Sequence, residues 1–177
     1  MFAGKTSEIQ SVVRRYKCLG KPVMVLTANI DTRFLDPDSP MAVISHDRTS
    51  VPARAVGVND LMDVLNWSCY AEATAIVIDE AQFFKGCLIP FVRAAIECGK
   101  QLTVVGLDSD AEQNPFGDVL ALGALADSIE KKTALCKRCG DGTAAIFTRA
   151  LGSRMSGQVE VGGAELYEPV CRRHYHS

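Results

Sequence analysis

The chain begins MFAGKTSEIQ (residues 1–10), in which Gly4-Lys5-Thr6 has the form of the closing half of a phosphate-binding loop, G-x-x-x-x-G-K-[ST]. The opening glycine and the strand that feeds such a loop would lie before Met1. After the loop, apolar residues recur at helical spacing up to Tyr16, and Gly20 is a plausible stop. GKT alone is a common tripeptide. Because a helix follows it directly, we favour a phosphate loop, and we expect the numbered sequence to lack the first strand.

Alternating strand and helix patterns follow along the chain. The expected elements are strands at 21–29, 75–78 and 101–107, helices at 59–67, 88–98 and 118–129, and loops at 31–43 and 109–117. The run Ala75–Ile78 is continuously apolar, as in a parallel strand that helices cover on both faces. Alternation of this kind predicts one α/β domain with a parallel sheet flanked by helices.

Acidic residues stand where the two central strands end. Asp79-Glu80 follow the first apolar run, and Asp108 follows the second. Open α/β sheets bind ligands at this edge. In a phosphate-loop enzyme Asp79 would hold Mg²⁺ and Glu80 would act on a substrate hydroxyl. The alternative, an acidic first turn of a helix, does not account for the GKT.

The segment after residue 133 differs in character, with many glycines and short strand-like pieces. Cys136-x-x-Cys139 and Cys171-x-x-His174 form two pairs with metal-ligand spacing. Two such pairs supply the four tetrahedral ligands of a structural zinc site. A redox CxxC would leave the second pair unexplained, so we predict zinc. The other cysteines, which lie among apolar residues, are expected to be buried thiols: Cys18, Cys69, Cys87 and Cys98.

Composition excludes several classes of protein. The chain has 177 residues, 47% hydrophobic and 23% charged, with a net charge of −2. This charge does not favour a nucleic-acid or membrane surface. No apolar run approaches the ~20 residues that span a bilayer, and no signal peptide is visible. We expect a soluble, cytoplasmic protein.

Seven motifs in order resemble the cellular (type II) thymidine kinases: MFAGKTSEI, DTRF with SHDR, IVIDEAQFF, LDSDAEQNPFG, CKRC, VGGAELY and CRRHY. The family's phosphate loop reads G-P-M-F-[AS]-G-K-[ST], so Met1 falls inside it. The resemblance implies a P-loop (RecA-like) α/β kinase domain at 1–133. It also implies a small zinc-binding lasso domain at 134–177 that closes over the nucleoside.

The same resemblance implies a role for individual residues. Glu80 would be the general base. The residues implied to bind ATP and phosphate are Phe2, Ala3, Gly4, Lys5, Thr6, Arg33, Asp79 and Gln82, with Mg²⁺ on Thr6 and Asp79. Those implied to bind the nucleoside are Met1, Phe83, Leu107, Phe116, Thr148, Gln158, Val159, Glu160, Val161, Gly162, Gly163 and Tyr167.

Two departures fall near the nucleoside site. Ala111-Glu112 stands where the family carries an aromatic followed by a basic or polar residue, and Thr148-Arg149-Ala150 replaces T-x-R. Loss of a stacking aromatic weakens base binding by roughly 1–3 kcal/mol. The departures therefore predict looser thymidine binding with phosphoryl transfer preserved.

The function that these observations favour is transfer of the γ-phosphate of ATP to the 5′-hydroxyl of thymidine, giving dTMP for nucleotide salvage. The family is commonly tetrameric, so a homotetramer is expected. The alternative is a non-catalytic paralogue or structural subunit that binds nucleotide. A zinc-ribbon module for nucleic acid is disfavoured by the acidic pI, near 5.9.

Overall fold

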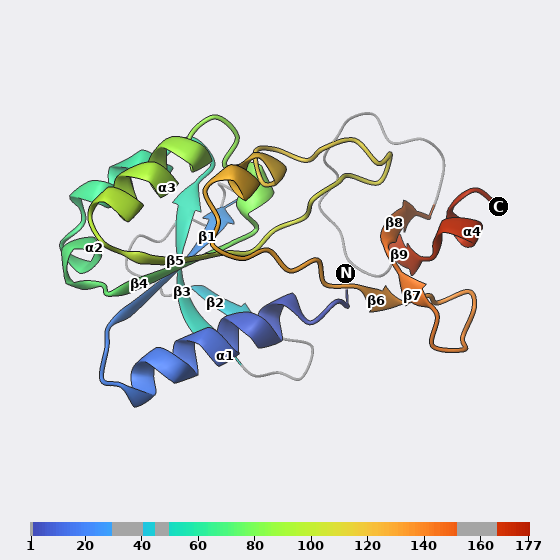
Figure 1. Ribbon diagram of the computed structural model, residues 1–177, viewed down its shortest axis with the longest axis horizontal. Helices are drawn as coiled ribbons and strands as arrows, with labels where there is room; N and C mark the ends of the chain where they lie inside the picture. Colours follow the sequence, from blue (N-terminus) through green and yellow to red (C-terminus); the bar gives the residue numbers. More distant parts are fainter. Residues whose placement is uncertain (1, 30–40, 45–49, 152–165) are drawn as a thin grey trace. The chain divides into compact units, whose positions relative to one another are not determined.

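The computed structural model describes residues 2–29, 41–44, 50–151 and 166–177 (Figure 1). It divides into two compact units. We call Thr6–Asp108 with Phe116–Asp127 the sheet unit. We call the described parts of Met1–Lys5, Ser109–Pro115 and Ser128–Ser177 the cysteine-rich unit.

A five-stranded sheet forms the centre of the sheet unit. Its order is β2 (Met41–Ile44), β3 (Ser50–Gly57), β1 (Val23–Asn29), β4 (Ala75–Asp79) and β5 (Gln101–Val104). Strands β3, β1, β4 and β5 are mutually parallel, whereas β2 pairs antiparallel with β3. The predicted parallel α/β fold is confirmed.

Helix α1 (Lys5–Cys18) covers one face of this sheet. Its residues Ile9, Val12 and Val13 are buried in a cluster that includes Val25 of β1 and Val77 of β4. This cluster anchors the helix that follows the GKT on the sheet. Because side chains alternate along a strand, the residues next to these two valines face the other side of the sheet.

The opposite face carries α3 (Leu88–Glu97) and the short helices η2 (Leu61–Asn66) and α2 (Ser68–Glu72). Leu26, Ile76 and Ile78 from the strands are fully buried there against Leu88 and Phe91 of α3. Figure 1 shows α1 and α3 on opposite sides of the sheet. With both faces covered, the continuous apolar run of β4 is explained.

Several expected boundaries were wrong. The loop expected at 31–43 includes the start of β2, and β3, which contains Pro52 and Arg54, was not foreseen. The helix expected at 59–67 is the 3₁₀ helix η2. The helix expected at 118–129 is reduced to the 3₁₀ helix η4 (Leu120–Ala124), which contains a glycine, a poor helix former.

Two of the four cysteines expected to be buried are exposed. Cys18 ends α1 and Cys98 follows α3, so both lie where a helix leaves the core. Cys69 and Cys87 are partly buried.

The cysteine-rich unit contains two small antiparallel ladders and one helical turn. Strand β6 (Ala134–Leu135) pairs with β7 (Ala144–Ala145), and β8 (Phe147–Ala150) pairs with β9 (Tyr167–Val170). The four-residue helix α4 (Arg172–Tyr175) follows β9. The small core of the cysteine-rich unit contains Ala134, Ala145 and Val170 together with Cys136 and Cys171.

Candidate active site and metal cluster

The carboxylates predicted to act in catalysis lie at the carboxyl end of β4. Asp79 is buried, and its Oδ1 accepts a hydrogen bond from the backbone N–H of Glu80 at 2.9 Å. Glu80 has a left-handed backbone conformation, with φ of 51° and ψ of 39°, and precedes the 3₁₀ turn η3 (Ala81–Phe83). A non-glycine residue adopts this conformation at a cost of roughly 1–2 kcal/mol. Such strain is common at functional sites.

Gln82 connects Glu80 to the next strand. Its side chain is 2% exposed, and its Nε2 lies 2.5 Å from Oε2 of Glu80. Its Oε1 accepts a hydrogen bond from the backbone N–H of Leu107 at 3.0 Å. One buried amide therefore orients the Glu80 carboxylate against the backbone that follows β5.

An aromatic pair lies beside this network. The rings of Phe83 and Phe116 meet edge to face, with centroids 5.4 Å apart and planes at 80°. The N–H of Phe116 donates to the carbonyl oxygen of Asp108 at 3.2 Å. The structure thus brings Asp79, Glu80, Gln82, Phe83, Leu107 and Phe116 to the ends of β4 and β5.

Two glycines that the sequence analysis did not single out support Gln82. A Cβ on Gly117, whose φ is 59°, would clash with the Gln82 carbonyl oxygen. A Cβ on Gly106 would lie 3.0 Å from Oε1 of the same residue. Gly117 belongs to the PFG motif, which is a sequence signal that could have pointed to it. Its close approach to a distant backbone emerges only from the fold.

The GKT begins helix α1. Gly4 has a φ of 76°, which favours glycine, and Lys5 is the first helical residue, with Thr6 after it. Helix N-termini offer unpaired N–H groups and a partial positive charge to anions. This local arrangement is compatible with phosphate binding.

The cysteine-rich unit brings together Cys136, Cys139, Cys171 and His174. Their ligand atoms all lie within 4.8 Å of one another. His174 Nδ1 is 3.5 Å from Cys136 Sγ and 3.3 Å from Cys139 Sγ, and Cys139 Sγ is 3.8 Å from Cys171 Sγ. A tetrahedron with Zn–S of ~2.3 Å and Zn–N of ~2.0 Å has edges of about 3.5–3.8 Å. The cluster can therefore hold a metal such as zinc.

The surroundings of the cluster shift the pKa of two of its thiols. Burial raises the pKa of the Cys136 thiol, but the N–H of Cys171, at 3.3 Å, and the His174 ring oppose this and lower the pKa to about 6. A lowered thiol pKa favours the thiolate that metals bind. Cys139 differs, because burial and the neighbouring thiols raise its pKa.

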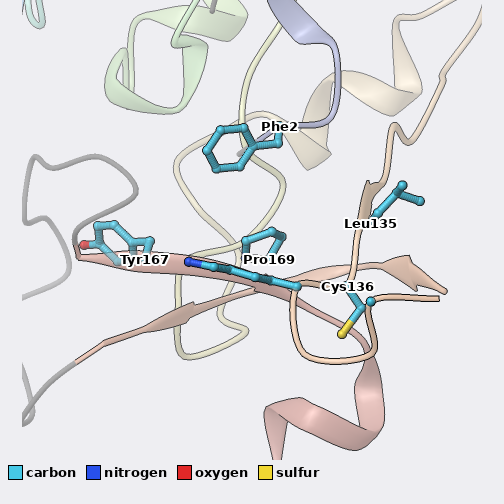
Figure 2. Close-up of a pocket in the computed structure, with 7 residues that line it drawn as sticks. Phe2, Leu135, Cys136, Tyr167 and Pro169 are labelled. Carbon is cyan, nitrogen blue, oxygen red and sulfur yellow. The ribbon is translucent and has the colours of Figure 1, made fainter. Parts of the chain in front are cut away.

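A cavity of about 410 Å³ in the same unit is lined by two of the predicted site residues. Figure 2 shows Phe2 and Tyr167 on its walls, with Leu135, Cys136 and Pro169. Thr148 lies on β8, which pairs with β9, the strand that carries Tyr167. Met1, Arg33 and the segment from Gln158 to Gly163 lie outside the described residues.

The fold is that of an α/β protein with a parallel central sheet, and the chain also contains a Cys/His cluster that can hold a metal. A family model described as thymidine kinase matches residues 1–175. The chain belongs to the thymidine kinase family, which is a family of kinases.

The chain is similar to several curated thymidine kinases. It is 38% identical over 178 residues to one from Oryza sativa subsp. japonica, covering 99% of this chain and 63% of that relative. It is 33% identical over 175 residues to one from Porphyromonas gingivalis, covering 99% and 80%. It is 37% identical over 180 residues to thymidine kinase a of Arabidopsis thaliana, covering 99% and 71%. Among the described residues, none of the helices has the length and hydropathy of a membrane span.

Proposed function

We propose that this protein transfers the γ-phosphate of ATP to the 5′-hydroxyl of thymidine, giving dTMP for nucleotide salvage. The observation that carries the proposal is the position of Glu80, directly after the buried Asp79 and held by Gln82. A carboxylate fixed at the end of a central strand suits an acid–base role. Family membership supplies the substrate class.

Glu80 acts as the general base in this proposal. Its carboxylate accepts the proton of the 5′-hydroxyl as the oxygen attacks the γ-phosphorus of ATP, and the bond from that phosphorus to the bridging oxygen breaks to release ADP. Because Gln82 is anchored on the Leu107 N–H, the carboxylate is held in place before the substrate arrives. Positioned general bases contribute typically 10²–10⁴-fold to a rate.

The phosphates are assigned to the start of α1. Lys5 neutralises charge on the β- and γ-phosphates. The backbone N–H groups from Phe2 to Gly4 donate hydrogen bonds to the phosphates, and Thr6 is the next residue after Lys5. Arg33 and Gln82 are assigned near the phosphates by resemblance. The Thr6 hydroxyl and the Asp79 carboxylate are oxygen donors of the kind that Mg²⁺ prefers. Mg²⁺ bound there with ATP would offset charge on the transferring phosphoryl group.

Thymidine is assigned to the edge-to-face pair Phe83 and Phe116 and to Leu107, whose N–H donates to Gln82. The remaining nucleoside contacts are proposed from the family resemblance: Met1, Thr148, Gln158, Val159, Glu160, Val161, Gly162, Gly163 and Tyr167. Aromatic side chains favour planar bases through stacking.

The larger organisation is proposed on the same resemblance. Residues 1–133 form the kinase domain, and residues 134–177 form a lasso domain that a structural Zn²⁺ stabilises. The protein acts as a cytoplasmic homotetramer. The alternative is a non-catalytic paralogue or structural subunit that binds nucleotide. The substitution of Ala111 for a family aromatic bears on nucleoside binding and does not by itself favour this alternative.

A transfer assay separates these two functions. The protein is incubated with γ-labelled ATP, Mg²⁺ and thymidine, with deoxycytidine as the control nucleoside, and the labelled monophosphate is measured. We expect labelled dTMP and much less product from deoxycytidine. Nucleotide binding without labelled dTMP would establish the non-catalytic paralogue instead.

A further inference from the structure

The loop Ser109–Pro115 is a self-bonded turn built around Asp110. Oδ1 of Asp110 accepts hydrogen bonds from the N–H groups of Glu112, at 2.9 Å, and Asn114, at 2.8 Å. The N–H of Asp110 donates in turn to the Asn114 carbonyl oxygen at 3.0 Å. Asp110 is 9% exposed. Because these bonds connect the loop to itself, we expect its backbone to be held or released as one unit.

Tyr175 of α4 holds this loop from outside. Its hydroxyl donates a hydrogen bond to the carbonyl oxygen of Ala111 at 2.7 Å, across 64 positions of sequence. Its ring packs against Phe147 of β8, with centroids 5.2 Å apart. The ring contact and the hydroxyl contact are therefore separable by substitution.

The helix that carries Tyr175 is adjacent to the Cys/His cluster. Helix α4 has four residues, and isolated helices of that length are not stable. Cys171 immediately precedes it and His174 lies within it, so two cluster ligands frame the turn. The N–H of Tyr175 also donates to the Cys171 carbonyl oxygen at 3.0 Å. A metal bound to the cluster would fix α4 and, with it, the Tyr175 ring.

We propose that Tyr175 transmits metal occupancy of the cluster to the loop 109–115, and so is a positioning residue for the nucleoside site. The inference rests on the proposed function for one step only: that Ala111, which stands where the resembling family carries an aromatic residue, belongs to the thymidine site. Metal binding and nucleoside binding are then coupled through one hydroxyl group. Occupied clusters hold the Ala111 backbone in place, and empty clusters release it.

Hydrogen exchange of the Glu112 and Asn114 amides tests the coupling. The protein is loaded with one equivalent of Zn²⁺ or stripped with a chelator, both as wild type and as Tyr175→Phe. Stripping should raise loop exchange in the wild type by about fivefold, the scale of one lost hydrogen bond. Loaded Tyr175→Phe should show the same rise with its zinc retained. Stripping that variant should add little, because the two changes break one connection.

Tyr16→Phe on α1 is the matched control, since it removes a tyrosine hydroxyl from the sheet unit. It should leave loop exchange unchanged. Unchanged loop exchange in Tyr175→Phe, or an additive effect of stripping, would overturn the proposal.

Kinetics separate the coupling from the proposed function. Tyr175→Phe should raise the KM for thymidine while the KM for ATP and kcat stay near wild type. This split distinguishes positioning from a general loss of structure. Raised loop exchange with an unchanged thymidine KM would support the coupling and contradict the assignment of this loop to the nucleoside site.

Discussion

Arg138 and Glu168 form an ion pair in which Nε and Nη2 of the guanidinium both lie 2.7 Å from Oε1 of the carboxylate. The Glu168 side chain is 7% exposed and that of Arg138 is 36% exposed. Arg138 lies between the cysteines of the first ligand pair, and Glu168 lies on β9 just before the second. The ion pair therefore ties the two halves of the cluster together.

The first prediction is that Arg138→Ala destabilises the cysteine-rich unit by about 1–3 kcal/mol, because it leaves the buried Glu168 carboxylate without its cation. Thermal unfolding of the zinc-loaded protein measures the change. Lys132→Ala is the matched control, since its partner Glu130 is exposed and such pairs contribute about 0–1 kcal/mol. Equal effects of the two substitutions would show that the burial of Glu168 is unimportant.

The second prediction concerns the base. Glu80→Gln should lower kcat by about 10²–10⁴-fold and leave ATP and thymidine binding largely unchanged. The reason is that the amide keeps the shape of the side chain but cannot accept the proton. Steady-state kinetics and calorimetric titration of both substrates provide the measurement. A variant with near-wild-type kcat would remove Glu80 from the base role.

The third prediction is one zinc per chain, held by Cys136, Cys139, Cys171 and His174. Elemental analysis of unchelated protein measures it, and a protein without zinc would contradict it. Cys139→Ser should release the metal and raise the KM for thymidine more than the KM for ATP. The reason is that metal binding and folding of the ligand-bearing segment are coupled.

The fourth prediction tests the contact between Gly117 and Gln82. Gly117→Ala should be less stable than Gly20→Ala by about 1–3 kcal/mol, the usual cost of overpacking. Both glycines have positive φ, 59° and 64°, but a Cβ on Gly20 meets no atom within 4 Å. Chemical denaturation of the two variants isolates the clash from the backbone strain. An equal loss of stability in the two variants would mean that the Gln82 backbone moves aside without cost.

The fifth prediction concerns Ala111, at a position where the resembling family carries an aromatic. Ala111→Phe should lower the KM for thymidine by about 10-fold, or ~1.4 kcal/mol, and leave the KM for ATP nearly unchanged. The new ring would cover one face of the base, and the carbonyl that accepts the Tyr175 hydrogen bond would be retained. Both Michaelis constants are measured on variant and parent. An unchanged thymidine KM would place Ala111 away from the base.

The fold was predictable where the signal was local. The helix after the GKT, the buried strand that ends in Asp79-Glu80, and helix α3 follow from apolar spacing over a few residues. Strand β3 was missed because Pro52 and Arg54 interrupt its apolar pattern. The helix expected at 118–129 shrank to a single 3₁₀ turn, since Gly117 and Gly123 weaken the local preference.

The candidate site could be predicted from the sequence because its groups are neighbours along the chain: Asp79 beside Glu80, Cys136 near Cys139, and Cys171 near His174. Residues this close along the chain are also close in space, whatever the rest of the fold.

Contacts between distant positions depended on the tertiary structure. The bond of Gln82 to the Leu107 N–H requires β4 and β5 to be adjacent, and the bond of Tyr175 to Ala111 joins segments 64 positions apart. Strand order and the path of the chain are set when the apolar faces of all the helices and strands are buried against one another. No short stretch of residues contains that information, so these connections emerge only when the chain is folded.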